Sequence, residues 1–369
     1  MRSKHTKQLV VVVGAGATLC DAQSKSLKEK PPLDRGFFSV CEKIGKQEHY
    51  PTIKKYLSDF YSIDPSDQIY DSLERVMAVI YADIHSPVLG DRALEAFRSI
   101  IRLFNRRIAE TTNLMAVTNR GGLYRILAKK LGEGYLPANI TIITLNQDIQ
   151  IEKTLERLEK TKTYSKYGSL MSFPYCYKIL DAAQKLTAAP DHLPTFEVDQ
   201  TDQGGIAVLK LHGSLNWFSV HDINEIPRDA VLSQSKTFRI TPRSQIPPAL
   251  RFQSDKNRLY TFPLIVPPVN HKSAIIHDDL RPLWNLAEER LINAAEIVVF
   301  GYSCPQTDFE SANLLRRATR RANKPEMFSV VDPSHEAFTR YVQVTCLDRL
   351  NYFRTCDAFV SAPGLVSMA

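Results

Sequence analysis

The most regular feature of the chain is a series of short apolar runs, each followed at its C-terminal end by glycine or polar residues. The first run, Leu9–Val13, contains only leucine and valine and ends at Gly14. Similar runs lie in the segments NITIITL, GIAVLKLHG, AEIVVFGYS and MFSVVDPS. Runs of this kind are typical of strands that are buried on both faces of a parallel sheet. The pattern therefore predicts an α/β fold with an open, mostly parallel sheet.

Amphipathic helices are predicted between the first two strands. The segments DSLERVMAVIYADI and ALEAFRSIIRLFNRRIAE carry apolar residues at helical spacing. A third segment, GLYRILAKKLGEG, ends in basic residues and glycines, which is a signal for the end of a helix. The apolar stripes of the first two segments are Leu73, Val76, Met77 and Ile80, and Phe97, Ile101, Phe104 and Ile108.

These elements divide the chain into a discontinuous core and its interruptions. We predict a core formed by residues 1–36 and 138–369, with a large helical insertion at 37–137. A smaller helical segment is expected at 151–200, and residues 218–272, rich in Pro, Ser and Arg, are expected to be irregular with short strands.

Composition adds little to this picture. A chain of 369 residues that is 44% hydrophobic can bury a sizeable core, as one large domain with an insertion or as two domains. The net charge of +7 is spread over interspersed acidic and basic residues, so it is a weak indication of a nucleic-acid partner. The one concentrated basic stretch, Leu314–Lys324, is interpreted as a solvated helix face rather than a docking surface.

The cysteines indicate a reducing environment. Six are scattered along the chain without a C-x-x-C pair, unlike the dense cysteines of a secreted disulfide scaffold. The apolar run near the N-terminus is shorter than the roughly 7 to 15 residues of a signal-peptide core. No run approaches the roughly 20 apolar residues of a membrane span. We expect a cytoplasmic protein without a membrane-spanning segment.

Candidate chemistry begins at the end of the first strand. Gly14 and Gly16 lie where a strand meets a helix, so backbone N–H groups there could face a diphosphate without a Cβ atom in the way. A full dinucleotide fingerprint needs a third glycine, but Leu19 occupies that position, which disfavours a simple Rossmann dehydrogenase. A tight turn without any ligand is an equally acceptable interpretation of these glycines.

Polar residues that follow the other strands should gather at one edge of the sheet, because ligands of open α/β sheets bind outside the carboxyl ends of the strands. Asn146 and Asp148 follow the second predicted strand and His212 follows the third. A histidine can accept a proton near neutral pH, since its unperturbed pKa is roughly 6.5. A lone histidine is more often structural, but its position at this edge and the glycine beside it favour a catalytic role.

The last two predicted strands end in further polar residues. Ser303, Thr307 and Asp308 follow one of them and could bind phosphate or cap the next helix; capping is the favoured interpretation for Asp308. Asp332 follows the strand FSVV and is placed to accept hydrogen bonds from the two hydroxyls of a ribose.

In their order, the motifs GAGAT, TLNQD, LHGS, GYS and VVDPS resemble the sirtuin family. The resemblance implies a Rossmann-like fold that binds NAD, with Asn146 and Asp148 around the nicotinamide ribose and His212 as the catalytic base. The segment PPLDRGFF resembles the flexible cofactor loop of sirtuins. The cofactor-binding residues implied by the resemblance are Gly14, Ala15, Gly16, Thr18, Asp34, Arg35, Phe37, Gly301, Ser303 and Asp332.

The chain also departs from the sirtuin deacylases. They carry two C-x-x-C zinc-binding pairs after the HG motif, whereas no cysteine lies between His212 and Cys304, so no zinc module is expected. Their F-G-E strand, which clamps a peptide substrate, is replaced by FPLIVPPVNHK, whose prolines remove hydrogen-bond donors. With the large helical insertion, these features resemble the prokaryotic sirtuin-like NAD hydrolases of anti-phage defence, which often act with a HerA-type ATPase or an argonaute.

Three functions follow from this resemblance. The first is an NAD glycohydrolase that gives nicotinamide and ADP-ribose, with NAD as substrate and no metal. The second is an NAD-dependent protein deacylase, which the missing zinc and peptide strand disfavour. The third is a catalytically silent NAD-sensing module, against which the presence of Asn146 and His212 argues. An NAD-draining enzyme needs a gate, so a homo-oligomer is expected, with nucleic acid involved only indirectly and no membrane.

Overall fold

The computed structural model describes residues 7–23, 31, 34–44, 50–64, 67–113, 115, 117–167, 170–171, 177–179, 196–198, 204–222, 238–240, 259–266, 280–320 and 324–363. Its central element is a parallel sheet in which the strands lie in the order β11-β10-β9-β1-β2-β5. The strands are β1 (Leu9–Val13), β2 (Ile140–Thr144), β5 (Ala207–Lys210), β9 (Glu296–Phe300), β10 (Met327–Val331) and β11 (Asn351–Phe353).

The strand order identifies the sheet as doubly wound. Numbered by their place in the chain and read from the β5 edge, the six strands run 3-2-1-4-5-6, the order of Rossmann-type dinucleotide-binding sheets. The predicted α/β, Rossmann-like fold is confirmed. The order reverses between β1 and β9, and ligands of such sheets bind beside the carboxyl ends of the strands at this reversal.

All five strands expected from the apolar runs are present, and the sixth, β11, was not predicted. Every residue of β1 is buried, which explains its uninterrupted leucine and valine. In contrast, β11 is an edge strand of three half-buried residues, NYF, and so lacks the apolar run by which buried strands are recognised.

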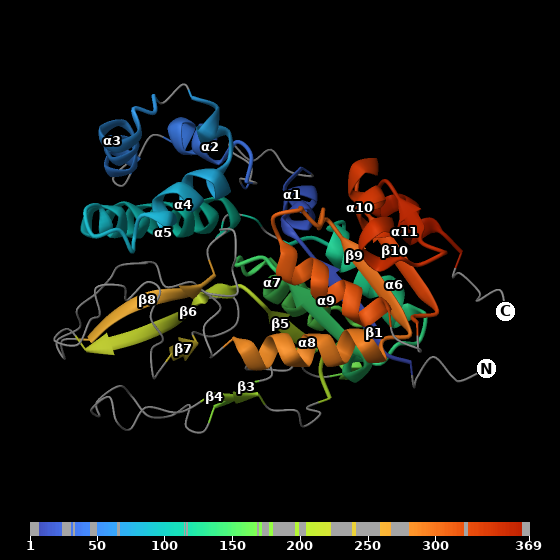
Figure 1. Ribbon diagram of the computed structural model, residues 1–369. Coiled ribbons are helices and arrows are strands. Elements are labelled where there is room, and N and C mark those ends of the chain that lie inside the picture. Colours follow the sequence, from blue (N-terminus) through green and yellow to red (C-terminus); the bar gives the residue numbers. More distant parts are fainter. Residues whose placement is uncertain are drawn as a thin grey trace.

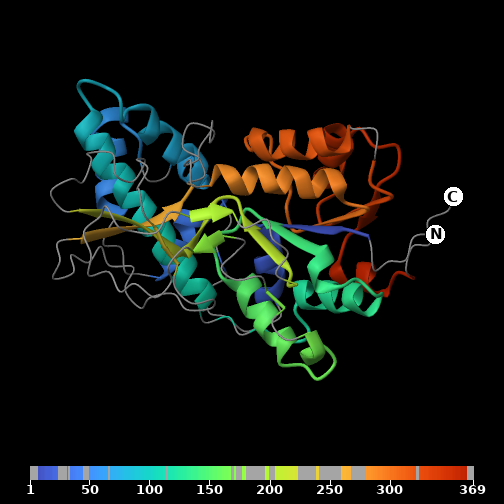
Figure 2. The same cartoon turned by 90° about the horizontal axis from the view of Figure 1, so that it is seen from below.

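Helices cover both faces of the sheet, as Figure 2 shows for α8 and α9 on one side and α6 and α7 on the other. On the first side, α9 contacts both α8 and α10; on the second, α6 contacts α1, α7 and α11. The bounds are α1 (Ala15–Gln23), α6 (Gly122–Gly132), α7 (Gln150–Glu159), α8 (Arg281–Asn293), α9 (Phe309–Thr319), α10 (His335–Thr345) and α11 (Cys356–Ser361).

A second hydrophobic core belongs to four helices between α1 and α6, which stand beside the sheet domain in Figure 1. They are α2 (Phe37–Ile44), α3 (Tyr50–Tyr61), α4 (Leu73–Ala82) and α5 (Gly90–Asn113). The apolar stripe predicted for α4 is buried, and α3 and α4 both pack on α5. The helix α6 was predicted correctly, but its buried residues belong to the core of the sheet domain rather than to this helical unit.

The remaining described elements are short helical turns and antiparallel strands. The turns are Gln68–Asp71, Pro137–Asn139 and Ser165–Tyr167. The strands β6 (Gly213–Asp222), β7 (Phe238–Ile240) and β8 (Leu259–Ile265) form one antiparallel sheet, and β3 (Tyr177–Ile179) pairs with β4 (Phe196–Val198). The strands β7 and β8 and the end of β6 lie in residues 218–272, where short strands were expected. The segment 151–200 was expected to be helical; α7 agrees with this, whereas β3 and β4 are strands, and most of both regions lies outside the described residues.

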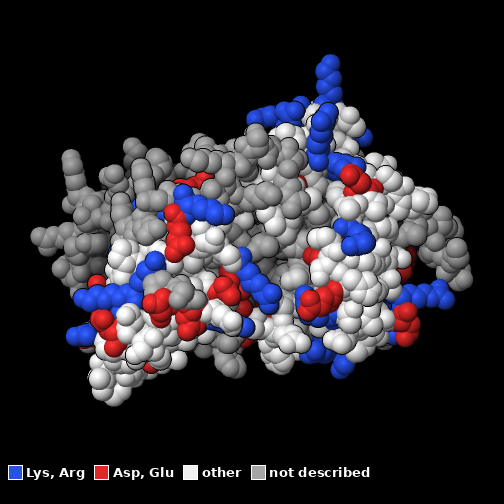
Figure 3. All heavy atoms as spheres, turned by 90° about the horizontal axis from the view of Figure 1, so that it is seen from above, with Lys and Arg blue, Asp and Glu red and all other residues white. Residues whose placement is uncertain are grey.

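Charged side chains of both signs are intermixed over much of the face in Figure 3, apart from a group of basic side chains at its upper edge. On α9, the basic stretch makes local ion pairs: Arg317 binds both carboxylate oxygens of Glu288 (2.9 and 3.0 Å). This agrees with a solvated helix face; residues 321–323 of the stretch lie outside the described residues. Among the described helices, none combines the length and apolar character that a membrane crossing requires.

Candidate functional site

Two glycine turns meet where the strand order reverses, one after β1 and one after β9. The amide of Gly16 donates to the carbonyl of Gly301 (N···O 2.8 Å), and the amide of Gly14 donates to the carbonyl of Phe300 (3.1 Å). A Cβ atom on Gly301, whose φ is +61°, would lie 2.1 Å from the amide nitrogen of Ala17. Close packing of two protein turns therefore accounts for these glycines, as the ligand-free interpretation supposed.

Thr18, on the first helix, joins that helix to the loop after β2. Its hydroxyl donates to Asp148 Oδ2 (2.8 Å) and accepts from Asn146 Nδ2 (3.2 Å). All three side chains are buried. A hydroxyl donates one proton and accepts others, so the three groups form a directed chain from amide through hydroxyl to carboxylate. The structure thus brings together three predicted site residues.

The amide of Asn146 keeps one hydrogen-bonding atom for a ligand. Its Nδ2 is engaged by Thr18, whereas the described residues make no hydrogen bond to its Oδ1. The Oδ1 atom can therefore accept a hydrogen bond from a water molecule or a sugar hydroxyl.

The loop Leu145–Ile149, which carries these residues, is fixed by backbone groups on both sides. Its Gln147 carbonyl accepts from the amide of Leu215 on β6 (2.8 Å). Asp148 Oδ1 accepts from the amide of Gln150, the first residue of α7 (2.9 Å). Polar residues follow this buried strand because the loop must provide hydrogen-bond acceptors. One accepts from the first amide of α7 and another from an amide of β6.

His212 lies at the same edge of the sheet as Asn146. Thr144 pairs with Lys210 across β2 and β5, and Asn146 and His212 each follow this pair by two residues. The carbonyl of His212 accepts from the amide of Val266 (2.9 Å), and its side chain is 95% buried, with an exposed fraction of 5%. The sheet thus places an imidazole on the strand next to the one that carries the carboxamide.

Asp332 and Ser303 lie at the ends of β10 and β9. Asp332 Oδ1 accepts from the amide of Ser334 (2.9 Å), while Arg340 donates from Nε to the carbonyl of Ser303 (2.9 Å). Burial raises the pKa of Asp332 above its ordinary value, and the Ser334 amide and the Arg340 charge oppose that rise. The carboxylate of Asp332 is thus held at the carboxyl edge in an environment that disfavours its charge.

Asp308 differs from its predicted role as a capping side chain. It is the residue that precedes α9, but its side chain makes no capping hydrogen bond; instead Asp308 Oδ2 accepts from the Tyr302 hydroxyl (2.8 Å). Capping fails here because the carboxylate turns toward the buried tyrosine. Beside it, burial raises the pKa of the Cys304 thiol to about 12, so this cysteine is protonated at neutral pH and is a poor nucleophile.

The predicted cofactor loop contacts the helical unit. Asp34 accepts hydrogen bonds from Ser72 Oγ (2.9 Å) and from the amide of Glu74 (2.8 Å), and so caps the start of α4. Arg35 forms a backbone bridge with Ser72, and the Phe37 side chain is buried in the core of the helical unit. Pro32 and Leu33 lie outside the described residues. The side chains of Asp34 and Phe37 thus contact the helical unit.

A link nevertheless joins that helix to the sheet domain. Thr307, in the loop after β9, donates from Oγ1 to Glu74 Oε2 in the first turn of α4 (2.8 Å). The start of α4 therefore lies against the loop that follows one of the two strands at the reversal point.

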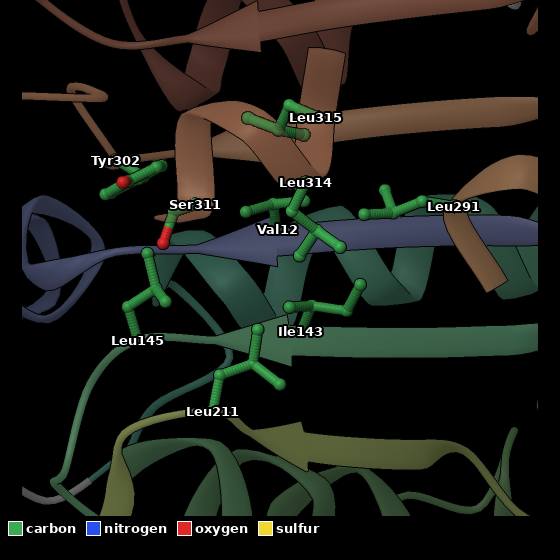
Figure 4. Close-up of a pocket in the computed structure, with 9 residues that line it drawn as sticks. All are labelled: Val12, Ile143, Leu145, Leu211, Leu291, Tyr302, Ser311, Leu314 and Leu315. Carbon is green, nitrogen blue, oxygen red and sulfur yellow. The ribbon is translucent and has the colours of Figure 1, made fainter. Parts of the chain in front are cut away.

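The cavity in Figure 4 is separate from these polar groups. It is an apolar space of about 10 Å³ between the sheet and the helices α8 and α9, lined by Val12, Ile143, Leu145, Leu211, Leu291, Tyr302, Ser311, Leu314 and Leu315. That volume holds about one water molecule. It is far too small for a nucleotide, and we assign it no role.

Two buried charged residues at the carboxyl edge were not identified from the sequence. Lys210 ends β5 and Glu152 lies on α7, and their side chains form an ion pair (Nζ···Oε1 2.9 Å). The available signal was the lysine in the otherwise apolar segment GIAVLKLHG, because a buried strand rarely contains a charge without a partner. As for metals, no group of three His, Cys, Asp or Glu side chains gathers within the part of the chain that the structure describes.

Comparison with known proteins gives weak structural likenesses. No family model and no curated protein matches the chain. Among solved structures, a mutant of a Sir2 homologue in complex with ADP-ribose matches with a TM-score of 0.45 and 14% identity, over 97% of this chain and 90% of that chain. A complex of a Sir2 homologue with NAD matches with a TM-score of 0.44 and 13% identity, over 97% of this chain and 88% of that one.

These values show similarity to Sir2 structures at low sequence identity. With TM-scores below 0.5, the likenesses establish neither a shared fold nor a shared activity. The assignment of the sheet as Rossmann-like rests on its own strand order.

Proposed function

We propose that the protein is an NAD glycohydrolase, which uses water to cleave NAD into nicotinamide and ADP-ribose. One observation carries the proposal: the hydrogen-bonded chain Asn146–Thr18–Asp148 lies at the carboxyl edge. It joins α1 to the loop after β2, and β2 is the neighbour of β5, the strand that precedes His212. This edge is where ligands of doubly wound sheets bind. The order of the sirtuin-like motifs in the sequence supports NAD as that ligand.

The proposed reaction demands little of the protein. The bond between nicotinamide and C1 of the ribose breaks, nicotinamide leaves as a neutral molecule, and water adds to C1 with loss of a proton. Asn146 Oδ1 accepts a hydrogen bond from the attacking water or from a ribose hydroxyl and so positions it. His212 takes the proton as general base.

Asp148 acts in this scheme by orienting its neighbours. Both of its carboxylate oxygens accept hydrogen bonds from the protein, one from Thr18 and the other from the amide of Gln150. Its charge also favours the cationic sugar of the transition state.

For the diphosphate and the adenosine ribose of NAD, fewer binding residues are available than the motifs imply. The amide of Gly14 already bonds to the last residue of β9 and the amide of Gly16 to the turn after it, so the diphosphate would lie at the N-terminal end of α1 near Ala15, where the helix dipole favours an anion. Asp332 would accept hydrogen bonds from the adenosine ribose, as its place after β10 suggests.

Unchecked cleavage of NAD would harm the cell, so we extend the proposal to a gated enzyme of anti-phage defence. The gate would be a homo-oligomer or a partner such as a HerA-type ATPase, in line with the prokaryotic sirtuin-like NAD hydrolases that the sequence resembles. A cytoplasmic location is part of the same proposal.

The test is to incubate the purified protein with NAD, with and without an acetylated peptide, and to quantify nicotinamide and ADP-ribose. We expect cleavage without the peptide, and a loss of about a hundredfold or more in Asn146→Ala. Release of nicotinamide only in the presence of the peptide would instead support the deacylase. NAD binding without turnover would support the silent sensor.

A further inference from the structure

Lys210 is a fully buried lysine that joins three elements at the carboxyl edge. Its exposed fraction is 0%, and so is that of its partner Glu152 (Nζ···Oε1 2.9 Å). The same ammonium group donates to the main-chain carbonyl of Asp148. One side chain thus connects the end of β5, the loop after β2 and the first turn of α7.

Stability alone does not account for this arrangement. Taking a lysine and a glutamate out of water is costly, and replacing a buried ion pair by apolar side chains of similar size is often neutral or stabilising. Such pairs can persist where they fix one particular geometry.

The position of the pair indicates which geometry is fixed. Lys210 precedes His212 by two residues, and it holds the carbonyl of the residue whose carboxylate accepts from Thr18. Thr18 in turn accepts from Asn146. The ammonium group is therefore a direct polar link between the end of β5, two residues before His212, and the loop that carries Asn146.

We propose that Lys210 is a positioning residue, which holds the loop Leu145–Ile149 in register with His212 through the Asp148 carbonyl, while Glu152 balances its charge. The expected effect on NAD cleavage rests on the proposed function. The expected effect on the position of the loop does not.

The test compares two double variants that each replace a buried lysine–glutamate pair by apolar residues. Lys210→Met/Glu152→Leu removes the pair at the carboxyl edge. Lys130→Met/Glu296→Leu removes a second pair, whose side chains are 4% and 5% exposed (2.6 Å) and lie at the amino end of β9. Both variants lose the same chemical groups, so a general effect of losing a buried ion pair would appear in both.

For Lys210→Met/Glu152→Leu we expect a melting temperature close to that of the parent protein. We expect kcat for NAD cleavage to fall about tenfold to a hundredfold with little change in KM, because misplaced catalytic groups cost rate. For Lys130→Met/Glu296→Leu we expect the parent kcat, measured at a temperature where it is fully folded. If Lys210→Met/Glu152→Leu has the kcat of the parent protein, or if both double variants lose kcat equally, the proposal is overturned.

Amide hydrogen exchange separates this inference from the proposed function. The amides of Gln150 and Leu215 bond to Asp148 and Gln147, so they report on the loop directly. They should exchange at least about tenfold faster in the Lys210 variant than in the parent, with the β1 amides unchanged. If the parent protein does not cleave NAD, the proposed function fails and this comparison alone decides: unchanged exchange rejects the positioning role.

Discussion

The two ends of the central sheet each contain a buried lysine–glutamate pair, but the pairs differ in what else they bind. At the amino end, Lys130 binds Glu296 and Glu133, and Glu296 also accepts from the Tyr135 hydroxyl (2.8 Å). All of these partners are side chains. At the carboxyl end, Lys210 binds Glu152 and also the main-chain carbonyl of a loop.

This difference separates a structural network from one that supports a site. The amino-end groups bind one another through side chains, and so join α6 and the residues after it to the start of β9. The carboxyl-end groups hold a loop on which Asn146 Oδ1 accepts no hydrogen bond from the described residues. Function in doubly wound sheets is expected at the carboxyl end, and there the polar network holds the loop that carries Asn146 and Asp148.

The largest expected effect is that of His212→Ala. Loss of the general base should lower kcat/KM for NAD cleavage by about a hundredfold or more, because a positioned base contributes about 10² to 10⁴ in rate. The matched amino-end change, Tyr135→Phe, should leave the rate unchanged. Steady-state kinetics of both variants, with circular dichroism to check folding, measures the contrast. If folded His212→Ala cleaves NAD at the parent rate, the assignment of the carboxyl edge as the catalytic site is wrong.

A smaller effect is expected at Thr18, which tests the hydrogen-bonded chain itself. Thr18→Val keeps the shape but removes the hydroxyl, so Asn146 and Asp148 lose their common partner. We expect kcat to fall about tenfold, the cost of about 1.4 kcal/mol in transition-state stabilisation. Thr18→Ser, which retains the hydroxyl, should recover most of the rate. If Thr18→Ser is as impaired as Thr18→Val, restoring the hydroxyl does not restore the rate, which would count against the role of the hydrogen-bonded chain.

Much of this comparison was accessible from the sequence. Asn146, Asp148 and His212 were predicted because polar residues follow uninterrupted apolar runs, and the parallel sheet brings such residues to one edge. Five of the six strands of the central sheet followed from apolar runs, and the helices α4 to α6 followed from periodicity or a helix-end signal. What the sequence could not provide was tertiary pairing: nothing in the local pattern around Glu152 points to Lys210, which lies 58 residues away.

Three other residues show the same limit: each matches a local pattern, but its partner in the fold is a different one. The position of Asp308 just before a helix is typical of a capping residue, yet the buried Tyr302 hydroxyl takes its carboxylate. The glycines Gly14 and Gly16 match a phosphate-binding turn, yet their amides bond to the carbonyls of Phe300 and Gly301 at the end of β9, which are close only in the folded chain. Local sequence indicates what a residue can do, and the neighbours brought by the fold determine which of these interactions it makes.

The amino end should respond to mutation in stability alone. Tyr135→Phe removes a hydrogen bond donated to a buried carboxylate and should lower the free energy of unfolding by about 1.5 kcal/mol. Urea unfolding at neutral pH measures this loss, and a parallel NAD assay should show the parent kcat and KM. A change in KM would mean that the two ends of the sheet are coupled.

The smallest expected effect tests whether the buried Asp332 carboxylate at the carboxyl edge lowers the stability of the folded protein. Burial raises the pKa of Asp332 above 3.8, so the folded protein holds this proton more tightly than the unfolded chain does. The contribution of Asp332 to stability is therefore fully present below pH 3.8 and is lost as the pH rises through the folded pKa. At pH 7 the buried carboxylate is a net cost.

Asp332→Asn removes that charge but keeps an oxygen that can accept from the Ser334 amide. At pH 7 we expect a rise in melting temperature on the order of one degree, and the difference from the parent should shrink as the pH is lowered toward 3.8. Thermal unfolding across this pH range measures both. A gain that does not change with pH would arise from something other than the buried charge. A loss at pH 7 would mean that the Arg340 and Ser334 contacts outweigh burial, and that the carboxyl edge, like the amino end, is stabilised by its charges.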